Sequence, residues 1–332
     1  MMKAVRLHAI GDLRVEDVAE PGPPAAREVK LKVEMAGICG SDLHNFRTGA
    51  WMSRVPSTPG HEFVATVVET GSGVTGLTVG DRVVADSRVP CGRCAACSSG
   101  RSYLCPSMGF VGEVNDGGFA PFTVLPEQQV LRLPDQSLPA VVAAMAEPLA
   151  VALHAVNRLN APRDVAVGIV GAGPIGALAT LALRHAGHPV LLAERNRARL
   201  DRVLEITGAT PWTLDAPDEY GKPAAAIDTT GAAPILNRLL GALERGGRLA
   251  VVGLYHGAVT VDPNLIVEGG LDVVGCAAFD NELGEAVDML PALAPELAAL
   301  ASRPITLNDV PAAFNDLIAG SGTIKALIDP EA

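Results

Sequence analysis

The sequence lacks a surplus of basic residues, and it shows no internal repeat or low-complexity stretch. It holds 26 lysines and arginines against 37 aspartates and glutamates, which gives a formal net charge of -11. A polyanion such as nucleic acid would be repelled by this charge balance. We therefore expect no nucleic-acid partner.

A long apolar run is also missing. In the amino-terminal segment Gly11, Asp12 and Glu16 interrupt any run of signal-peptide length. The apolar runs at 165–176 and 249–254 are too short and too rich in glycine to cross a bilayer. We therefore expect a cytoplasmic protein without a membrane span.

The chain is long and apolar enough for two domains, since it has 332 residues and 48% of them are apolar. From Lys3 to about Val130, short β-branched segments are punctuated by Gly and Pro, which predicts an irregular, mostly antiparallel β domain. Strand and helix signals then alternate, which predicts a parallel sheet with crossover helices. The late segment IKALIDP is expected to be a strand that returns to the first domain. The fold class is thus predicted as α/β, with domains at 1–147 and 148–281 and a return to the first domain over 282–332.

Four of the six cysteines are clustered in CGRCAACSSGRSYLC, with two, two and seven residues between them. These are Cys91, Cys94, Cys97 and Cys105. A cytosolic chain keeps thiols reduced, and four thiolates on tight turns can close a tetrahedral shell around zinc, with no position left for chemistry. An iron–sulfur cluster is the alternative, because the first spacings and the Cys105-Pro106 pair are similar to those of bacterial ferredoxins, although their final gap is three residues. The pattern favours a structural zinc lobe over about 88–108.

A second group of metal-binding residue types lies in GICGSDLH and PGHE. Taken singly, Cys39 would be a small buried hydrophobe and His61 a hydrogen-bonded loop histidine. Together they suit a zinc site, with Asp42 as the acceptor that fixes the imidazole tautomer. A catalytic zinc needs a third protein ligand, and Glu62 and Glu147 are both candidates. Glu147 would also serve as a capping acid at a helix start, so the residues alone leave this choice open.

A dinucleotide site is predicted from VAVGIVGAGPIG, where the pattern GxGxxG follows a strand and precedes a helix. Its residues are Gly171, Gly173, Pro174, Ile175 and Gly176. A tight turn and a helix amino terminus at this point suit a pyrophosphate.

An acidic residue is expected about twenty positions further on, where it would hold the ribose hydroxyls of the coenzyme, and Glu194 fits. A carboxylate there favours NAD because it repels a 2′-phosphate. Arg195, Arg197 and Arg199 follow at once and could attract one, so NADP stays open.

In this order, GICGSDLH, GHE, the cysteine lobe, AEPLAVALHA and GAGPIG resemble the zinc-containing medium-chain dehydrogenase superfamily over nearly the whole chain. The EPL glutamate is similar to that of its sorbitol, threonine and idonate dehydrogenase branch. The resemblance implies a GroES-like catalytic domain built from the first and last parts, a Rossmann coenzyme domain, two zinc ions per chain and a nicotinamide coenzyme.

The resemblance also implies roles for single residues. Cys39 and His61 match catalytic zinc ligands, and members of the branch use the glutamate matched by Glu62 or the one matched by Glu147, sometimes through water. Ser41 and His44 match a proton relay that passes the alcohol proton through the coenzyme ribose to solvent. From the residues alone, a turn hydroxyl and a surface histidine fit these two positions equally well.

The function implied is hydride transfer between NAD(P) and a secondary alcohol of a polyol, sugar acid or cyclitol, by a homodimer or homotetramer. The stretch MGFVGEVNDGGF resembles polyol and aldonate dehydrogenases such as the L-idonate 5-dehydrogenases, whereas FRTGAWMSRVPST departs from them. Trp51 in the latter either lines a substrate cleft or packs on the protein. The alternatives are a simple alcohol or aminocyclitol dehydrogenase and a nicotinamide-binding protein without activity.

Overall fold

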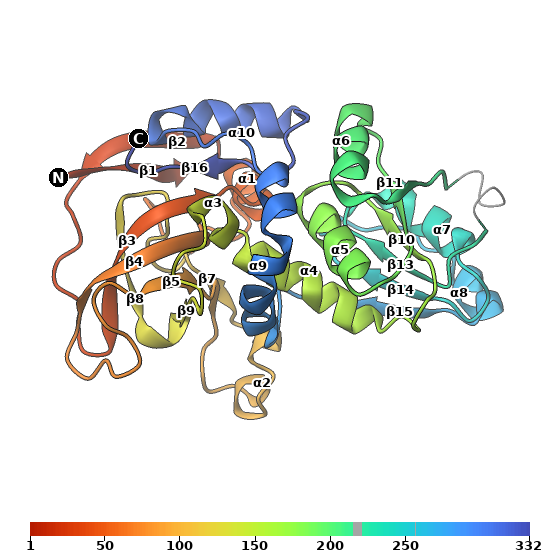
Figure 1. The fold of residues 1–332 in the computed structure, drawn as a ribbon, viewed down its shortest axis with the longest axis horizontal. Helices are drawn as coiled ribbons and strands as arrows, with labels where there is room; N and C mark the ends of the chain where they lie inside the picture. The colour runs from red at the N-terminus through yellow and green to blue at the C-terminus, as the bar shows by residue number, and fades with distance from the viewer. Residues whose placement is uncertain (215–220, 256) are drawn as a thin grey trace. The chain divides into compact units, whose positions relative to one another are not determined.

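The computed structural model describes residues 1–214, 221–255 and 257–332, which form two compact units. The first unit comprises Met1–Glu147 and Leu283–Ala332, and the second comprises Pro148–Glu282. In Figure 1 the first unit runs from red to yellow and returns in dark blue, whereas the second runs from green to light blue.

The first unit is built on a sheet in the order β16-β3-β4-β5-β9, with β8 paired to β3, and every pairing in it is antiparallel. Its strands are β3 (Glu28–Gly37), β4 (Glu62–Thr70), β5 (Arg82–Ala85), β8 (Phe122–Pro126), β9 (Val130–Arg132) and β16 (Leu327–Ile328). Two short pairs lie beside it, β1 (Met2–Ala9) with β2 (Asp12–Val18), and β6 (Arg88–Val89) with β7 (Gly109–Phe110). Its helices are α1 (Gly40–Thr48), α2 (Ala95–Ser98), α3 (Ala140–Ala143), most of α9 (Glu282–Leu300) and α10 (Val310–Ile318).

Alternation along β3 explains why this sheet has one buried face. Val29, Leu31 and Val33 are fully buried, while Lys30 and Lys32 between them reach solvent. The segment IKALIDP forms β16, whose Leu327 lies opposite Gly37 of β3. The β16 strand thus joins the end of the chain to the sheet of the first unit.

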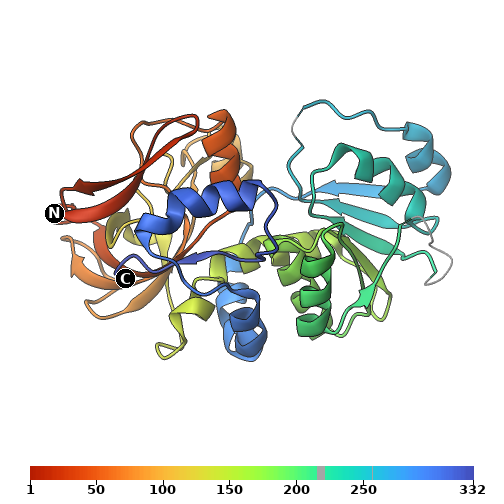
Figure 2. The same cartoon turned by 90° about the horizontal axis from the view of Figure 1, so that it is seen from above.

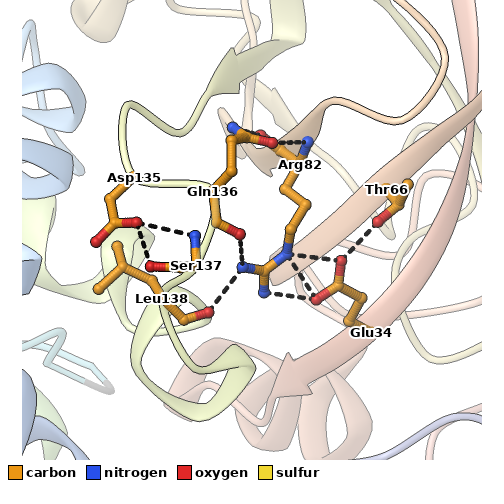
Figure 3. Close-up of polar contacts among 7 residues, drawn as sticks. All are labelled: Glu34, Thr66, Arg82, Asp135, Gln136, Ser137 and Leu138. Atoms are coloured by element: carbon orange, nitrogen blue, oxygen red, sulfur yellow. Dashed lines mark hydrogen bonds and ion pairs between the residues drawn. The ribbon is translucent and has the colours of Figure 1, made fainter.

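A side-chain network fastens the loop before α3 to this sheet (Figure 3). Arg82 of β5 donates to both carboxylate oxygens of Glu34 on β3, with the shortest contact at 2.6 Å, and to the carbonyls of Gln136 and Leu138 at 2.7 Å each. Thr66 of β4 also donates to Glu34, at 2.7 Å. Burial acts to raise the pKa of Glu34, but the hydrogen bonds from Arg82 and Thr66 outweigh it and lower that pKa.

The second unit is a parallel sheet in the order β12-β11-β10-β13-β14-β15. Its strands are β10 (Val167–Val170), β11 (Val190–Ala193), β12 (Thr210–Pro211), β13 (Ala225–Asp228), β14 (Arg248–Val251) and β15 (Asp272–Gly275). Its helices are most of α4 (Ala146–Leu159), α5 (Pro174–His185), α6 (Arg197–Thr207), α7 (Ala233–Ala242) and α8 (Pro263–Gly269). Figures 1 and 2 show helices on both faces of this sheet, which explains why strands such as β10 are buried along their whole length. The predicted α/β class with a Rossmann-type sheet is confirmed.

One stretch of the described residues, Ala140–Leu159, is long and apolar enough to cross a membrane by length and composition alone. Of its most apolar window, 72% is buried inside the protein. A core helix passes the same test, so this stretch is weak evidence for a membrane segment.

Candidate functional site

The four clustered cysteines come together in a lobe formed by α2, the 3-10 helix Ser102–Leu104 and the β6–β7 pair. Their sulfur atoms all lie within 4.8 Å of one another, and none of them is in a disulfide. Cys94 Sγ is 3.4 Å from Cys97 Sγ and 3.9 Å from Cys105 Sγ. Four sulfur atoms at this spacing fit the closed thiolate shell of a structural zinc.

The surroundings of Cys91 in this lobe favour the thiolate form of its side chain. Hydrogen bonds from the backbone N–H groups of Arg93 and Cys94 and from the Cys105 thiol lower the pKa of Cys91 to about 6. Burial and the neighbouring thiols raise the pKa of Cys97 to about 11. A divalent cation is what would hold all four sulfurs as thiolates at once, so the donor set fits the metal.

The second predicted metal group is brought together by the pairing of β3 with β4. Gly37 near the end of β3 lies opposite Glu62 at the start of β4, so Cys39 and His61 emerge at the same end of the sheet. The ligand atoms of Cys39, His61 and Glu62 lie within 4.8 Å of one another. The antiparallel register thus joins two motifs that are separate in the sequence.

Glycines allow close packing around the backbone of PGHE, residues 59–62, which we call the histidine motif. A Cβ on Gly112 would lie 2.9 Å from the nitrogen of Gly60, and one on Gly117 would lie 2.1 Å from its oxygen. Gly60 itself has φ +99° and has Phe119 where its Cβ would be. The glycines of FVGEVNDGGF therefore allow this segment to pack directly on the strand start that carries His61.

Asp42 lies beside His61, as predicted, and both are buried. Their closest atoms, His61 Nδ1 and Asp42 Oδ1, are 3.7 Å apart, while the other Asp42 oxygen accepts the backbone N–H of Cys39 at 2.9 Å. Burial acts to lower the pKa of His61, but the charges of Asp42 and Cys39 outweigh it and raise that pKa well above its usual value. Burial of the Asp42 carboxyl group raises its own pKa. Asp42 is thus placed to orient both Cys39 and His61.

Lys325 is a member of this site that sequence reasoning missed. It is only 1% exposed, forms an ion pair with the equally buried Glu62, and donates to the carbonyl of Ile38 at 3.0 Å. Gly37 leaves the room for this pair, because a Cβ there would lie 2.6 Å from Glu62 Oε2 and 2.7 Å from Lys325 Cε. A single lysine inside the apolar segment IKALI was the signal that could have found it.

Glu147, the other candidate third ligand, lies in the first turn of α4 and is buried. It is outside the compact group formed by Cys39, His61 and Glu62. Burial raises its pKa to about 7, and the charges of His61 and Glu62 also act on it. The structure therefore places Glu62 beside the candidate ligands Cys39 and His61, and Glu147 close enough to be affected by the charges of His61 and Glu62.

The two predicted relay residues lie one turn apart on α1. Ser41 Oγ is 3.4 Å from His61 Nε2, whereas His44 Nε2 is 3.3 Å from Thr48 Oγ1. The His44 and Trp51 rings lie 4.7 Å apart, so Trp51 packs on the histidine while part of it stays exposed.

Glu113 was also missed by sequence reasoning. It is half-buried in the turn that begins at Phe110, whose ring lies 6.2 Å from that of His61. Burial raises the pKa of Glu113 to about 7, with His61 acting against the shift and Asp42 adding to it. Among the described residues no basic side chain forms an ion pair with Glu113.

The predicted dinucleotide turn joins β10 to α5 in the second unit. Gly171 has φ +102°, and a Cβ there would lie 2.5 Å from Thr229 Oγ1. A Cβ on Gly176 would lie 1.8 Å from the carbonyl oxygen of Gly171, whereas the space beside Gly173 is open. Gly173 caps α5 and Pro174 begins it. The turn thus has the close packing and the open helix amino terminus that suit a pyrophosphate.

A cavity of about 640 Å³ lies at this turn. Of the predicted coenzyme residues, Gly171, Gly173, Glu194 and Arg195 line it, whereas Pro174, Ile175 and Gly176 are not among its lining residues. Arg199, Arg238, Trp212, Thr229 and Thr230 line it as well. Its size and position fit a dinucleotide.

Glu194 directly follows β11, and its carboxylate is held by the backbone. One oxygen accepts from Ala172 N and the other from Asn196 N, both at 2.8 Å, and Arg199 lies 3.9 Å away. These bonds fix Glu194 at the edge of the cavity.

Known proteins match this arrangement along the whole chain. Two family models match, the alcohol dehydrogenase GroES-like domain over residues 25–135 and the zinc-binding dehydrogenase over residues 174–292. The L-threonine 3-dehydrogenase of Deinococcus deserti is 30% identical and aligns with 95% of this chain and 94% of its own. The sorbitol dehydrogenase of Halalkalibacterium halodurans is 30% identical, with 97% of each chain aligned. A solved structure from Sinorhizobium meliloti 1021, reported as a zinc-binding dehydrogenase bound to NADP, is 32% identical, with a TM-score of 0.92 over 99% of both chains.

The chain therefore belongs to the zinc-containing medium-chain dehydrogenase superfamily, in the branch of the sorbitol and threonine dehydrogenases. It is an oxidoreductase that acts on CH–OH donors with zinc and a nicotinamide dinucleotide as cofactors. The predicted family, enzyme class and cofactors are confirmed, while the roles assigned to single site residues stay predictions.

Proposed function

We propose that this enzyme interconverts a secondary alcohol of a polyol, cyclitol or sugar acid with the corresponding ketone, at a zinc held by Cys39, His61 and Glu62. The observation that carries the proposal is the compact group of these three ligand atoms beside a buried lysine. Glu147, outside that group, is assigned to hold the substrate hydroxyl or a water.

The bound cofactors supply Lewis acidity, which lowers the pKa of a hydroxyl group, and a nicotinamide ring that takes or gives a hydride. The chain's own residues hold and move the proton. Ser41, next to His61, receives the hydroxyl proton, and His44, three residues further along the same helix face, passes it to solvent. Asp42 keeps the imidazole of His61 oriented.

The choice of Glu62 over Glu147 rests on geometry and charge. Glu62 lies within the ligand group, and its carboxylate forms a buried ion pair with Lys325. Glu147 has a pKa raised by burial, so it can hold a proton or a hydroxyl group when no cation is near.

The coenzyme is proposed to be NAD, with NADP as the second candidate. Glu194 is fixed where the adenosine ribose is expected, which favours NAD, whereas Arg195 and Arg199 line the same cavity. We further propose that the enzyme works in the cytoplasm as a homodimer or homotetramer.

The experiment is a panel of polyols, aldonates, cyclitols and simple alcohols assayed with NAD and with NADP, on wild-type protein and on Cys39→Ser. The proposal expects oxidation of one of the first three classes and loss of that activity in the variant. Oxidation of the simple alcohols alone would contradict the proposed substrate class, and full activity in Cys39→Ser would contradict the proposed metal site.

A further inference from the structure

A carboxylate is buried at the carboxyl end of β13. Asp228 is 0% exposed, and no basic side chain pairs with it in the described ranges 1–214, 221–255 and 257–332. One of its oxygens accepts from the backbone N–H and the hydroxyl of Thr230, at 2.8 and 2.7 Å, and the other accepts from the Tyr255 hydroxyl. Burial of a carboxylate is unfavourable unless hydrogen bonds compensate it, so these three donors stabilise the Asp228 side chain in its buried position.

These hydrogen bonds join two loops. Thr230 follows β13 and Tyr255 follows β14, and the Asp228 carbonyl also accepts from Gly253 N at 3.0 Å. The loops touch backbone to backbone, because a Cβ on Gly253 would lie 2.0 Å from the nitrogen of Gly231. Little can shift in one loop without moving the other.

The loop after β13 is joined in turn to the glycine turn after β10. Thr229 Oγ1 donates to the carbonyls of Val170 and Gly171, at 2.9 and 3.2 Å. Thr229, Thr230 and Gly171 all line the 640 Å³ cavity. Three loops at the carboxyl ends of neighbouring parallel strands are thus tied together where such sheets bind their ligands.

We propose that Tyr255 is a positioning residue for the coenzyme. The Tyr255 hydroxyl acts through Asp228 to hold the loops after β13 and β14 in the conformation that receives the nicotinamide half of the coenzyme. The inference rests on the coenzyme site proposed above. Burial and the charge of Asp228 raise the pKa of Tyr255, so the phenol stays protonated and donates throughout the working range.

The strand order indicates which half of the coenzyme depends on these loops. Glu194 follows β11, on one side of β10, whereas Asp228 and Tyr255 lie on the other side, at β13 and β14. A dinucleotide crosses such a sheet with its pyrophosphate at the turn after the central strand. With the adenosine ribose at Glu194, the nicotinamide half extends over β13 and β14.

The test compares the dissociation constants of NADH and AMP, measured by calorimetric titration on full-length, zinc-loaded protein. Tyr255→Phe is expected to weaken NADH by about tenfold, since a pre-organised loop loses one hydrogen bond to a charged group, and to leave AMP unchanged. Asp228→Asn is expected to give the same difference between the two ligands, and it serves as the second variant. Tyr103→Phe, which removes a tyrosine hydroxyl in the cysteine lobe of the first unit, is the control and should change neither.

Two results would overturn the proposal. Unchanged NADH binding in Tyr255→Phe shows that its hydroxyl does not act on the coenzyme, and equal weakening of NADH and AMP shows a general loss of structure instead of positioning. Wild-type protein that fails to bind NADH would overturn the coenzyme site itself, which separates failure of the proposed function from failure of this inference.

Discussion

Lys325, two residues before β16, and Glu62, the first residue of β4, form a buried ion pair. Their positions differ by 263 residues in the chain. The pair neutralises a carboxylate that would otherwise be isolated in a site with little access to water. It also ties the carboxyl-terminal segment to the proposed catalytic metal.

Replacing Lys325 with Met should destabilise the metal-free protein strongly. Removal of one partner leaves the Glu62 charge buried without compensation, so the free energy of unfolding should fall by about 3 kcal/mol. Zinc should recover part of this loss, because it supplies a new cation beside the same carboxylate. Urea unfolding with and without zinc measures both effects.

The control for that variant is Lys32→Met, which removes an exposed partner of Glu331 and should cost less than about 1 kcal/mol. Equal losses in the two variants would show that burial of the Lys325 pair has no energetic consequence.

Replacement of Glu62 and replacement of Glu147 should have different effects on the zinc content of the protein. Glu62→Gln removes a proposed ligand, so dialysed protein should retain about one zinc per chain, whereas Glu147→Gln should retain about two and lose turnover instead. Elemental analysis together with steady-state kinetics distinguishes them. The reverse result would make Glu147 the third ligand.

Cys97→Ser should act on stability and not on coenzyme binding. The lobe would lose its zinc, and thermal unfolding should shift to lower temperature because structural zinc contributes directly to folding. NADH affinity should be unchanged, since the proposed coenzyme cavity lies wholly in the other unit. A variant with full zinc content would argue against the four-sulfur site.

Glu113→Gln should change substrate preference by charge. Above its raised pKa of about 7, the half-buried Glu113 carboxylate near His61 is charged and disfavours an anionic substrate. In assays at a pH well above 7, its removal should therefore raise kcat/KM for an aldonate relative to that for the matching uncharged polyol. We expect a change of about threefold to tenfold, which corresponds to about 1 kcal/mol. The same ratio in both proteins would place Glu113 away from the substrate.

The pair of Glu34 with Arg82 should make stability depend on pH in the acid range. The folded-state pKa of Glu34 is lowered, so its contribution is complete above the unfolded-state pKa and is lost as the pH falls through the folded-state value. Glu34→Gln should therefore cost about 1 kcal/mol at pH 7, after allowance for solvent screening, and progressively less below about pH 4. A difference that stays constant from pH 7 to pH 3 would contradict this assignment.

Short-range signals sufficed for the metal and coenzyme motifs. The cysteine spacing predicts the four-sulfur lobe, and the glycine pattern predicts a turn that opens α5. Alternation in EVKLKVEMAG and continuous apolar runs in the later strands predict the two kinds of sheet. These features depend on residues near one another in the chain.

The remaining features depend on long-range register and could not be derived locally. Lys325 reaches Glu62 only because β16 pairs with β3. Asp228 meets Tyr255 only because β13 and β14 are neighbours in the sheet, and neither residue belongs to a recognisable motif. Glu113 comes close to His61 because glycines allow its segment to pack on the histidine motif, which no periodicity reveals.

The two proposed zinc sites can be located by anomalous scattering at the zinc edge, from crystals grown with the metal. We expect two peaks per chain, one among the four lobe sulfurs and one in contact with Cys39, His61 and Glu62. A single peak confined to the cysteine lobe would contradict this prediction.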